Sequence, residues 1–363
     1  MINKNDLYCI VMAGGIGSRF WPLSRTSRPK QFIDILGTGK SLLQQTFDRM
    51  VRICPPENII IVTSSMYHDL VLEQLPQINE DQVLLEPMRR NTAPCLAYAN
   101  YKIQQKNPNA IAIVAPSDHL ILNEDKFIET ITIAVDFASK NQALVTLGIK
   151  PSRPETGYGY IQIDKPVKGF SGLHKVKTFT EKPNLELAKV FMESGEFFWN
   201  SGLFVWNINS IQTAFENFLP EVNTLFKDAS QCFGSKDESL VIEKTYSECR
   251  NVSIDYGVME KADNVFVVCS EFGWSDLGTW GSLYTHIPHT STGNALLSKN
   301  IRLYKTDNTL VSAKEDKLVV VQGLSDYIVI DTDDVLLICK KQDEQQIKNF
   351  VSDIQLEQGE KYS

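Results

Sequence analysis

Several absences in the sequence narrow the classes of protein to which it can belong. The seven cysteines form no C-x-x-C pair, and none of the five histidines stands at a zinc-binding spacing from a cysteine. The first apolar run, residues 7–13, is only as long as a strand and ends in glycines, and no run approaches the length of a membrane span. Most cysteines lie in apolar runs, which suits a reducing compartment. We therefore expect a soluble, cytoplasmic protein without a secretory signal or membrane segment.

The chain also lacks the basic character that nucleic-acid binding requires. Its formal net charge is -8, whereas binding to a nucleic-acid backbone needs an extended surface of Lys and Arg. We therefore predict that nucleic acid is not a partner. One stretch has the opposite bias, because residues 7–33 contain no Asp or Glu at all. Such a local basic island remains compatible with a small phosphorylated ligand.

The basic island, MAGGIGSRFWPLSRTSRPKQ from Met12 to Gln31, begins where the first apolar run ends. Glycines allow backbone N–H groups to approach an oxyanion closely, while Arg and Lys supply neutralising charge. The pattern predicts a polyphosphate-binding loop, and the alternative is a solvated basic loop. The residues that form the pattern are Gly14, Gly15, Gly17, Arg19 and Lys30, with Arg25 and Arg28 as supporting charges.

Two better-known phosphate motifs do not fit this segment. In the dinucleotide fingerprint G-x-G-x-x-G, Phe20 stands where the third glycine should be. The tail of a P-loop is matched by Gly39-Lys40-Ser41, but Asp34 occupies the position of its first glycine, where a carboxylate would repel phosphate. We interpret Ser41 instead as the N-cap of a helix over residues 41–52.

The order of apolar and amphipathic segments predicts an α/β fold. The expected strands cover residues 7–13, 58–63, 110–115 and 143–149, and helical periodicity appears at 41–52 and 125–139. Alternation of this kind implies a mixed, mainly parallel sheet, in which ligands bind beyond the carboxyl ends of the strands. Residues 14–19 and 117–119 should therefore emerge at the same edge.

We expect two domains, over residues 1–288 and 289–363, with a Pro- and Gly-containing polar segment at their boundary. Shorter strands at 159–163, 197–206 and 264–269 and a helix at 185–194 belong to the first domain. The second is β-rich, with strands at 310–313, 318–322, 327–331 and 335–340. A last helix carries Ile347, Phe350, Val351 and Ile354 at helical spacing, so it should dock on a core or on a second subunit of a homodimer.

The basic island resembles the signature of sugar-phosphate nucleotidyltransferases, and its individual residues are similar to those of the mannose-1-phosphate guanylyltransferase family. Further segments in the same order, together covering about residues 7–282, are Glu86-Pro87, Arg90-Asn91-Thr92-Ala93-Pro94, Pro116-Ser117-Asp118-His119, Glu155-Thr156-Gly157-Tyr158-Gly159-Tyr160, Phe179-Thr180-Glu181-Lys182-Pro183, Trp199-Asn200-Ser201-Gly202, Ile254-Asp255-Tyr256-Gly257 and Gly273-Trp274-Ser275-Asp276. The resemblance implies a Rossmann-like, glycosyltransferase-A-like domain followed by a small left-handed β-helix. Longer relatives continue into an isomerase domain, so we expect one activity here.

The resemblance implies transfer of GMP from GTP to α-D-mannose 1-phosphate, with GDP-mannose and diphosphate as products. Such a reaction needs in-line positioning, neutralisation of three phosphates and a divalent cation, and no covalent nucleophile. Arg19 and the N–H groups of residues 14–17 would hold the β- and γ-phosphates, and Lys30 would neutralise charge on the α-phosphate. Asp118 and Asp276 would ligate Mg²⁺. The alternative for Asp118 is a helix cap.

Glu86 is the residue expected to read the base. A carboxylate can accept hydrogen bonds from both N1–H and the N2 amino group of guanine, whereas uracil offers one donor between two carbonyls. The other interpretation is a surface Glu before a turn proline. Arg90, Asn91 and Thr92 would complete the nucleotide pocket.

The sugar-binding residues follow from hydrogen-bonding capacity and from the resemblance. Glu181 can accept from two hydroxyls and Asn200 can donate and accept, as a pyranose requires. Lys182 would meet the sugar phosphate. Additional sugar-binding candidates are Tyr158, Gly159 and Asp255. Glu181 and Lys182 could instead form only a surface ion pair.

The alternatives for the whole chain are three other functions. One is a nucleotidyltransferase for another sugar 1-phosphate, such as a heptose or glucose, or for another base. A second is a non-catalytic regulatory subunit that binds a nucleotide sugar, against which the complete set of Arg19, Lys30, Asp118 and Asp276 argues. The third, a nicotinamide-dependent oxidoreductase, fails because the third glycine is missing.

Overall fold

The computed structural model describes residues 3–15 and 17–363, and its chain forms two compact units. Unit 1 comprises Met1–Gly14, Thr46–Ser117 and Ile121–Trp274, and unit 2 comprises Gly15–Gln45, Asp118–Leu120 and Ser275–Ser363. Residue 16, part of the predicted phosphate loop, lies outside the described residues. The predicted domains, 1–288 and 289–363, divide the chain at a single point, whereas each compact unit consists of three segments. The units differ from this because the basic loop packs with the C-terminal segment.

Unit 1 is built on a nine-stranded mixed sheet with the order β3-β2-β1-β4-β9-β6-β10-β8-β7. Its strands are β1 (Leu7–Met12), β2 (Ile59–Ser64), β3 (Val83–Glu86), β4 (Ile111–Pro116), β6 (Leu144–Ile149), β7 (Tyr160–Pro166), β8 (Leu173–Thr180), β9 (Phe197–Asn207) and β10 (Val265–Ser270). The pairings from β3 to β4 and between β6 and β10 are parallel. Strand β9 runs antiparallel between β4 and β6, and β8 runs antiparallel to β10 and β7. The predicted mixed, mainly parallel sheet is confirmed.

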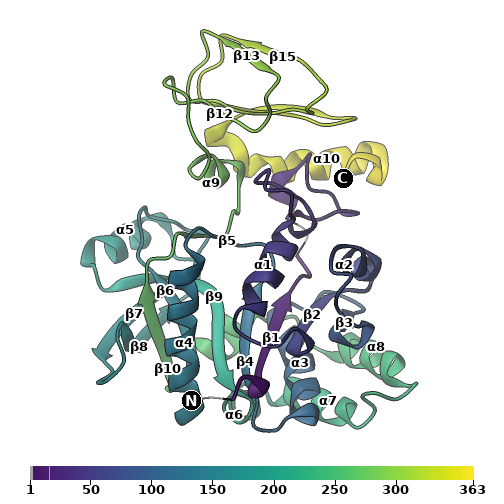
Figure 1. Cartoon of the computed structure of the whole chain (residues 1–363), viewed down its shortest axis with the longest axis vertical. Helices are drawn as coiled ribbons and strands as arrows, with labels where there is room; N and C mark the ends of the chain where they lie inside the picture. The colour runs from purple at the N-terminus through teal and green to yellow at the C-terminus, as the bar shows by residue number, and fades with distance from the viewer. Residues whose placement is uncertain (1–2, 16) are drawn as a thin grey trace. The chain divides into compact units, whose positions relative to one another are not determined.

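Helices cover both faces of this sheet (Figure 1). Helix α4 packs on β4, β6, β9 and β10, while α3 contacts β1 and β2 and packs with α6 and α7. The helices are α1 (Leu42–Val51), α2 (His68–Gln74), α3 (Thr92–Lys106), α4 (Glu124–Lys140), α5 (Leu185–Ser194), α6 (Ile208–Phe218), α7 (Pro220–Ser230) and α8 (Glu238–Glu248), with a π-helical segment η7 (Asp255–Met259). Short 3-10 segments are η1 (Lys4–Asp6), η4 (Pro56–Asn58), η5 (Ser65–Tyr67) and η6 (Glu80–Gln82).

The register of the central strands places two predicted site segments side by side in the sheet. Met12 at the end of β1 is paired with Pro116 at the end of β4. The Ser117 N–H donates to the Met12 carbonyl at 3.0 Å. Beyond these residues both segments leave the sheet: the one after β1 continues into the basic loop, and the one after β4 continues to Asp118. The prediction that these segments emerge at one edge is therefore correct.

Unit 2 has its own core, in which the basic loop packs against the C-terminal part of the chain. Phe20, Trp21, Trp280 and Ile347 belong to one buried apolar cluster, and the rings of Phe20 and Trp280 lie 4.8 Å apart. The helical segments of this unit are η2 (Ser18–Phe20), η3 (Lys30–Phe32), α9 (Trp280–Tyr284), η8 (Lys341–Gln346), α10 (Ile347–Gln358) and η9 (Gly359–Tyr362). The predicted last helix, α10, docks on this core.

The C-terminal strands of unit 2 pair in parallel, as expected for a β-helix, except that β17 runs antiparallel to β16. One sheet has the order β12-β14-β16-β17 and the other pairs β13 with β15. The strands are β12 (Ala295–Leu296), β13 (Ile301–Tyr304), β14 (Leu310–Ser312), β15 (Val319–Gln322), β16 (Tyr327–Asp331) and β17 (Leu336–Lys340). A further two-stranded sheet pairs β5 (Leu120–Ile121) with β11 (Trp274–Ser275).

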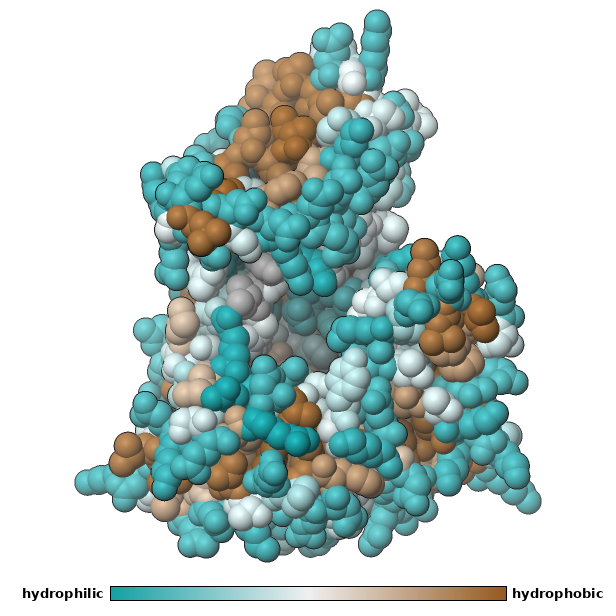
Figure 2. Space-filling view, turned by 180° about the vertical axis from the view of Figure 1, so that it is seen from behind, coloured by the Kyte–Doolittle hydropathy of each residue, from teal (hydrophilic) through white to brown (hydrophobic). Residues whose placement is uncertain are grey.

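Apolar side chains are exposed on the β-helix part, and Figure 2 shows apolar surface there. They include Tyr304, Val320, Leu336 and Ile338, each more than half exposed. The homodimer expected from the sequence stays a prediction. Within the described residues, no helix is both long enough and apolar enough to cross a membrane.

Candidate active site

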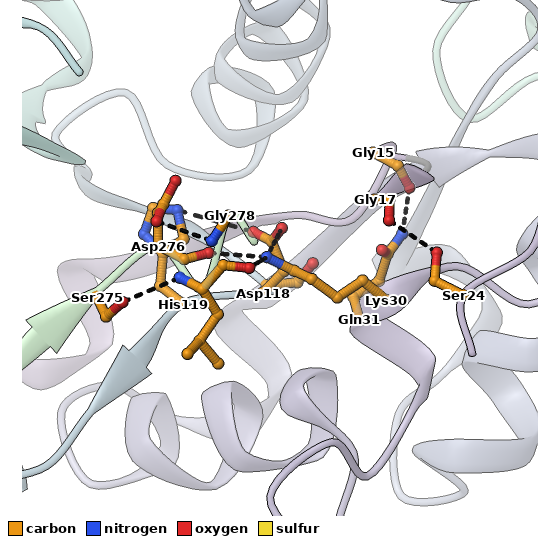
Figure 3. Close-up of polar contacts among 12 residues, drawn as sticks. Gly15, Gly17, Ser24, Lys30, Gln31, Asp118, His119, Ser275, Asp276 and Gly278 are labelled. Atoms are coloured by element: carbon orange, nitrogen blue, oxygen red, sulfur yellow. Dashed lines mark hydrogen bonds and ion pairs between the residues drawn. The ribbon is translucent and has the colours of Figure 1, made fainter. Parts of the chain in front are cut away.

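Most residues predicted to bind phosphate and metal line one pocket of unit 2, with a volume of about 230 Å³, whereas Gly14 and Gly15 are not part of its lining. Four separate segments contribute to it: the basic loop, the segment after β4 and the segment after β11, which Figure 3 shows, and helix α10. Arg19, Lys30, Asp118 and Asp276 are all present in the lining. The remaining lining residues are Gly17, Phe20, His119, Gly278 and Lys348.

Gly17 is required where the basic loop turns toward Lys30. Its φ is +62°, in the left-handed region, and a Cβ built on it would lie 2.5 Å from the Cβ of Lys30. The Ser24 hydroxyl donates to the Gly17 carbonyl at 2.8 Å, and the Gln31 amide donates to the Gly15 carbonyl at 2.9 Å. The loop is therefore tied to its own C-terminal half (Figure 3).

We expect Gly17→Ala to destabilise the protein more than Gly37→Ala does. Gly37 is a matched control because its φ is +67° and a Cβ added to it would meet no atom within 4 Å. A left-handed conformation alone costs a non-glycine residue about 1–2 kcal/mol, and only Gly17→Ala adds a clash with Lys30. Urea unfolding of both variants measures the difference. Equal free energies of unfolding would show that Gly17 is not constrained by Lys30.

Lys30 is the central cation of the pocket, and all its donors are engaged. Its Nζ donates to the carbonyl oxygens of Asp276 and Leu277 at 2.8 and 3.1 Å, and it lies 2.8 Å from Oδ2 of Asp118. The side chain is 4% exposed and its ammonium lies 5.7 Å from the centroid of the Phe20 ring. A buried ammonium needs this full set of partners. Lys30 thus joins the basic loop to the segments after β4 and β11.

Asp118 is held in its charged form by its cationic neighbours. Burial raises its pKa, but the charges of Lys30 and His119 and the hydrogen bond from Lys30 outweigh burial, so the pKa lies below its ordinary value. His119 Nε2 is 3.8 Å from Oδ1 of Asp118. Asp118 precedes strand β5 rather than a helix, so its interpretation as a helix cap is wrong.

The donor set of the pocket fits a Mg²⁺ ion. Asp118 and Asp276 face the same pocket from distant segments, and Oδ1 of Asp276 is oriented by the Gly278 N–H at 2.9 Å. Among the described residues, no three His, Cys, Asp or Glu side chains gather at a metal-binding spacing. An ion here would therefore take its other ligands from phosphate oxygens and water, a coordination that suits Mg²⁺.

Arg19 and Arg25 have different roles in the basic loop. The Nε of Arg19 is buried without a hydrogen-bond partner, although Arg19 lines the pocket. Arg25 forms a forked ion pair with Asp334, at 3.0 and 2.5 Å, and its Nε donates to the Pro22 carbonyl. Arg25 therefore supports the loop, as predicted, whereas Arg19 retains hydrogen-bonding capacity for a ligand.

Glu86, the predicted base-reading residue, lies in unit 1 at the end of β3. It is 8% exposed, and its Oε1 accepts a hydrogen bond from the hydroxyl of Tyr246 at 3.1 Å. Burial raises the pKa of Glu86 to about 7, although the hydrogen bond from Tyr246 and the charge of Arg89 act in the opposite direction. A Cβ on Gly14 would lie 3.1 Å from Oε2 of Glu86. The interpretation of Glu86 as a surface residue is wrong.

The segment after Glu86 is engaged in structural contacts. Arg90 donates to the carbonyl oxygens of Tyr246 and Ser247 at the end of α8, at 2.9 and 3.3 Å. Asn91 has a φ of 68° and caps α3 by accepting from the Thr92 N–H. The Thr92 hydroxyl accepts from the Ile254 N–H at 2.9 Å. Nucleotide binding by these three residues stays a prediction.

The predicted sugar-binding residues gather in another part of unit 1. The side-chain amide of Asn200 donates through Nδ2 to Oδ1 of Asp255 at 2.8 Å and accepts through Oδ1 from the Thr146 hydroxyl at 3.0 Å. Burial, followed by the charge of Glu181, raises the pKa of Asp255 to about 7. The ring of Tyr158 lies 5.1 Å from that of Trp199. Asp255 thus orients Asn200.

Glu181 combines an ion pair with an unsatisfied oxygen. Its Oε1 is 2.7 Å from Nζ of Lys182, while its Oε2 is buried without a hydrogen-bond partner. A Cβ on Gly159 would lie 2.3 Å from Oε2, so a glycine is required there. Burial lowers the pKa of Lys182, but the hydrogen bond and charge of Glu181 raise it above its ordinary value. Because the Glu181 side chain is only 9% exposed, it forms more than a surface ion pair.

Comparison with protein families assigns both parts of the chain. Residues 8–292 match the model of the family described as Nucleotidyl transferase, and residues 300–354 match the MannoseP isomerase/GMP-like beta-helix domain. The chain belongs to the nucleotidyl transferase family. The predicted enzyme class and the predicted combination of folds are thereby confirmed.

Individual relatives of this nucleotidyl transferase cover nearly all of the chain. A protein named mannose-1-phosphate guanylyltransferase from Escherichia coli K12 is 36% identical over 97% of this chain and 74% of its own length. One of the same name from Salmonella montevideo is 37% identical over 96% of this chain and 74% of its own length. A crystal structure described as mannose-1-phosphate geranyltransferase from Thermus thermophilus has a TM-score of 0.86 and 29% identity, and covers 96% of this chain and 99% of its own.

Sequence reasoning missed two residues that the nucleotidyl transferase fold brings to these sites. Lys348, in α10, lines the pocket of unit 2, and Tyr246, in α8, contacts Glu86. Both lie in helices, where a lone Lys is normally solvated and a lone Tyr normally belongs to the core. No local motif distinguishes them from such residues.

Proposed function

We propose that the protein transfers GMP from GTP to α-D-mannose 1-phosphate and releases diphosphate, giving GDP-mannose. The observation that carries the proposal is the pocket that combines Arg19, Lys30, Asp118 and Asp276. The relatives of about 35% identity named mannose-1-phosphate guanylyltransferase support the choice of substrates. The seven cysteines are all free thiols, which is in keeping with a cytoplasmic location.

The reaction forms one bond and breaks one. A phosphate oxygen of the sugar phosphate attacks the α-phosphorus of GTP, and the bond from that phosphorus to the oxygen bridging to the β-phosphate breaks. Arg19 would bind the β- and γ-phosphates, and Lys30 would neutralise charge that develops on the α-phosphate. Mg²⁺, held by Asp118 and Asp276, would supply further charge neutralisation. The chemistry requires no covalent enzyme intermediate.

Residues of unit 1 would recognise the guanine base and the sugar phosphate. The buried carboxylate of Glu86 can accept two donors from the Watson–Crick edge of guanine. The unsatisfied Oε2 of Glu181 is an acceptor for a sugar hydroxyl, because a buried oxygen without a partner costs free energy until a ligand donates to it. Lys182, about half exposed, would meet the sugar phosphate.

The test is a matrix of triphosphates and sugar phosphates, with diphosphate release as the measurement. GTP, ATP, UTP and dTTP would each be combined with the 1-phosphates of mannose, glucose and a heptose, with and without Mg²⁺. We expect GTP with mannose 1-phosphate and Mg²⁺ to give the highest kcat/KM. A different best pair would overturn the substrate assignment, and no release with any pair would indicate a regulatory subunit.

A further inference from the structure

The phosphate pocket includes one cation from the far end of the chain. Lys348 is the second residue of α10, in the segment matched by the β-helix domain model, yet it lines the pocket with Arg19 and Lys30. The neighbouring Ile347 is fully buried in the core of unit 2 beside Phe20 and Trp280. Helix α10 also contacts η2, which carries Arg19. The position of Lys348 is therefore fixed by packing.

Lys348 and Arg19 place two positive charges close together in the pocket. Among the described residues, Lys348 forms no ion pair, whereas Lys30 is paired with Asp118. The charge of Arg19 lowers the pKa of Lys348, which indicates that the two cations are close. In addition, the Nε of Arg19 is buried without a partner. A polyanion bound between these side chains would relieve their repulsion and satisfy the unpaired donor.

The size of the pocket limits how much of a ligand it holds. Its volume of about 230 Å³ lies below the roughly 300–1,000 Å³ of pockets that enclose a drug-sized ligand. It therefore suits the phosphate tail rather than a whole nucleotide.

We propose that Lys348 binds the β- and γ-phosphates of the nucleotide, and hence the diphosphate leaving group, so that the C-terminal helix contributes a residue to the catalytic pocket. The inference rests on the function proposed above. Negative charge builds up on the diphosphate as its bond to the α-phosphorus breaks, and a cation in contact with it stabilises that charge. Removal of α10 would thus impair catalysis directly.

The experiment compares substrates that do and do not carry the relevant phosphates. Lys348→Met should raise the KM for GTP and, in the reverse reaction, the KM for diphosphate by about tenfold, as expected for loss of a charge-assisted hydrogen bond. The KM for GDP-mannose should stay unchanged, because that molecule lacks the β- and γ-phosphates of GTP. Lys348→Arg should restore most of the affinity. Lys340→Met, at an exposed lysine of β17 outside the pocket, is the matched control.

Thermal unfolding with and without diphosphate gives a readout that is independent of turnover. The ligand-free variant should unfold at or slightly above the wild-type temperature, because Lys348 is exposed and its removal relieves the repulsion with Arg19, while the stabilisation by diphosphate should be reduced. Unchanged KM values and unchanged stabilisation by diphosphate in Lys348→Met would overturn the inference. A wild-type protein that releases diphosphate from no substrate pair would instead overturn the proposed function.

Discussion

Replacing Lys30 with methionine is expected to lower kcat by roughly 100- to 1,000-fold, the usual effect of removing one preorganised charge-stabilising donor. The Nζ of Lys30 is the cation shared by Asp118 and by two carbonyl oxygens of the segment after β11. Methionine has a similar length but no charge. The variant would therefore keep most of the apolar contacts with Phe20 while it loses every polar contact.

The same substitution should also reduce stability, because it leaves buried acceptors without a donor. Loss of the bonds to the Asp276 and Leu277 carbonyls would cost about 1–3 kcal/mol. Asp118 adds less, since its side chain is 31% exposed and its charge is partly screened. Urea unfolding separates this loss from the loss of kcat, which is measured at saturating substrates well below the unfolding midpoint.

Lys40→Met is the control that tests the loop assignment. Lys40 belongs to the P-loop-like Gly39-Lys40-Ser41 and is exposed, and Ser41 caps helix α1, as predicted, by accepting from the Gln44 N–H at 3.2 Å. We expect this variant to keep wild-type kcat. A large loss in Lys40→Met together with normal turnover in Lys30→Met would contradict the assignment of the phosphate site.

Replacing Glu86 with glutamine is expected to lower kcat/KM for GTP by roughly 10- to 100-fold, as follows from loss of a hydrogen bond to a charged group. Glutamine keeps one acceptor oxygen but presents an amide NH₂ to the base, where guanine also donates. The preference for GTP over UTP, and for GTP over ITP, which lacks the N2 amino group, should therefore shrink. Unchanged preferences in Glu86→Gln would exclude Glu86 as the base-reading residue.

The pKa of Glu86 makes this recognition dependent on pH. Burial raises that pKa to about 7, so the carboxyl is protonated below pH 7 and charged above it. Only the carboxylate accepts both donors of guanine, so kcat/KM for GTP should rise as the pH increases through 7 and then level off. In Glu86→Gln this rise should disappear.

Tyr246→Phe offers a second readout of the same group. The Tyr246 hydroxyl donates to Oε1 of Glu86 and favours the charged form. Its removal should move the rise in kcat/KM to higher pH without abolishing it. A profile that stays at the wild-type pH in Tyr246→Phe would contradict the contribution of this hydrogen bond.

The local signals of the sequence predicted some elements of the fold and missed others, among them β3, β8, α3 and α6. Runs of apolar residues located β1, β2, β4 and β6 to within one or two residues, and helix α5 coincides with the predicted residues 185–194. Strand β8 was not predicted because polar side chains alternate irregularly along it and most of them are exposed. Local propensity decides such elements only where one face is clearly apolar.

The sequence by itself determined the glycine-rich turn of the basic loop and the charged residues around it, because turn conformation and charge are properties of short segments. The tertiary structure alone decided that the loop packs with the C-terminal segment, that Lys348 joins Arg19, and that Tyr246 contacts Glu86. It also decided that Arg90 bonds to α8 and that Asn200 is oriented by Asp255. Each of these contacts joins residues far apart in the chain, and which side chains meet depends on how complete elements pack into a common core rather than on any local pattern.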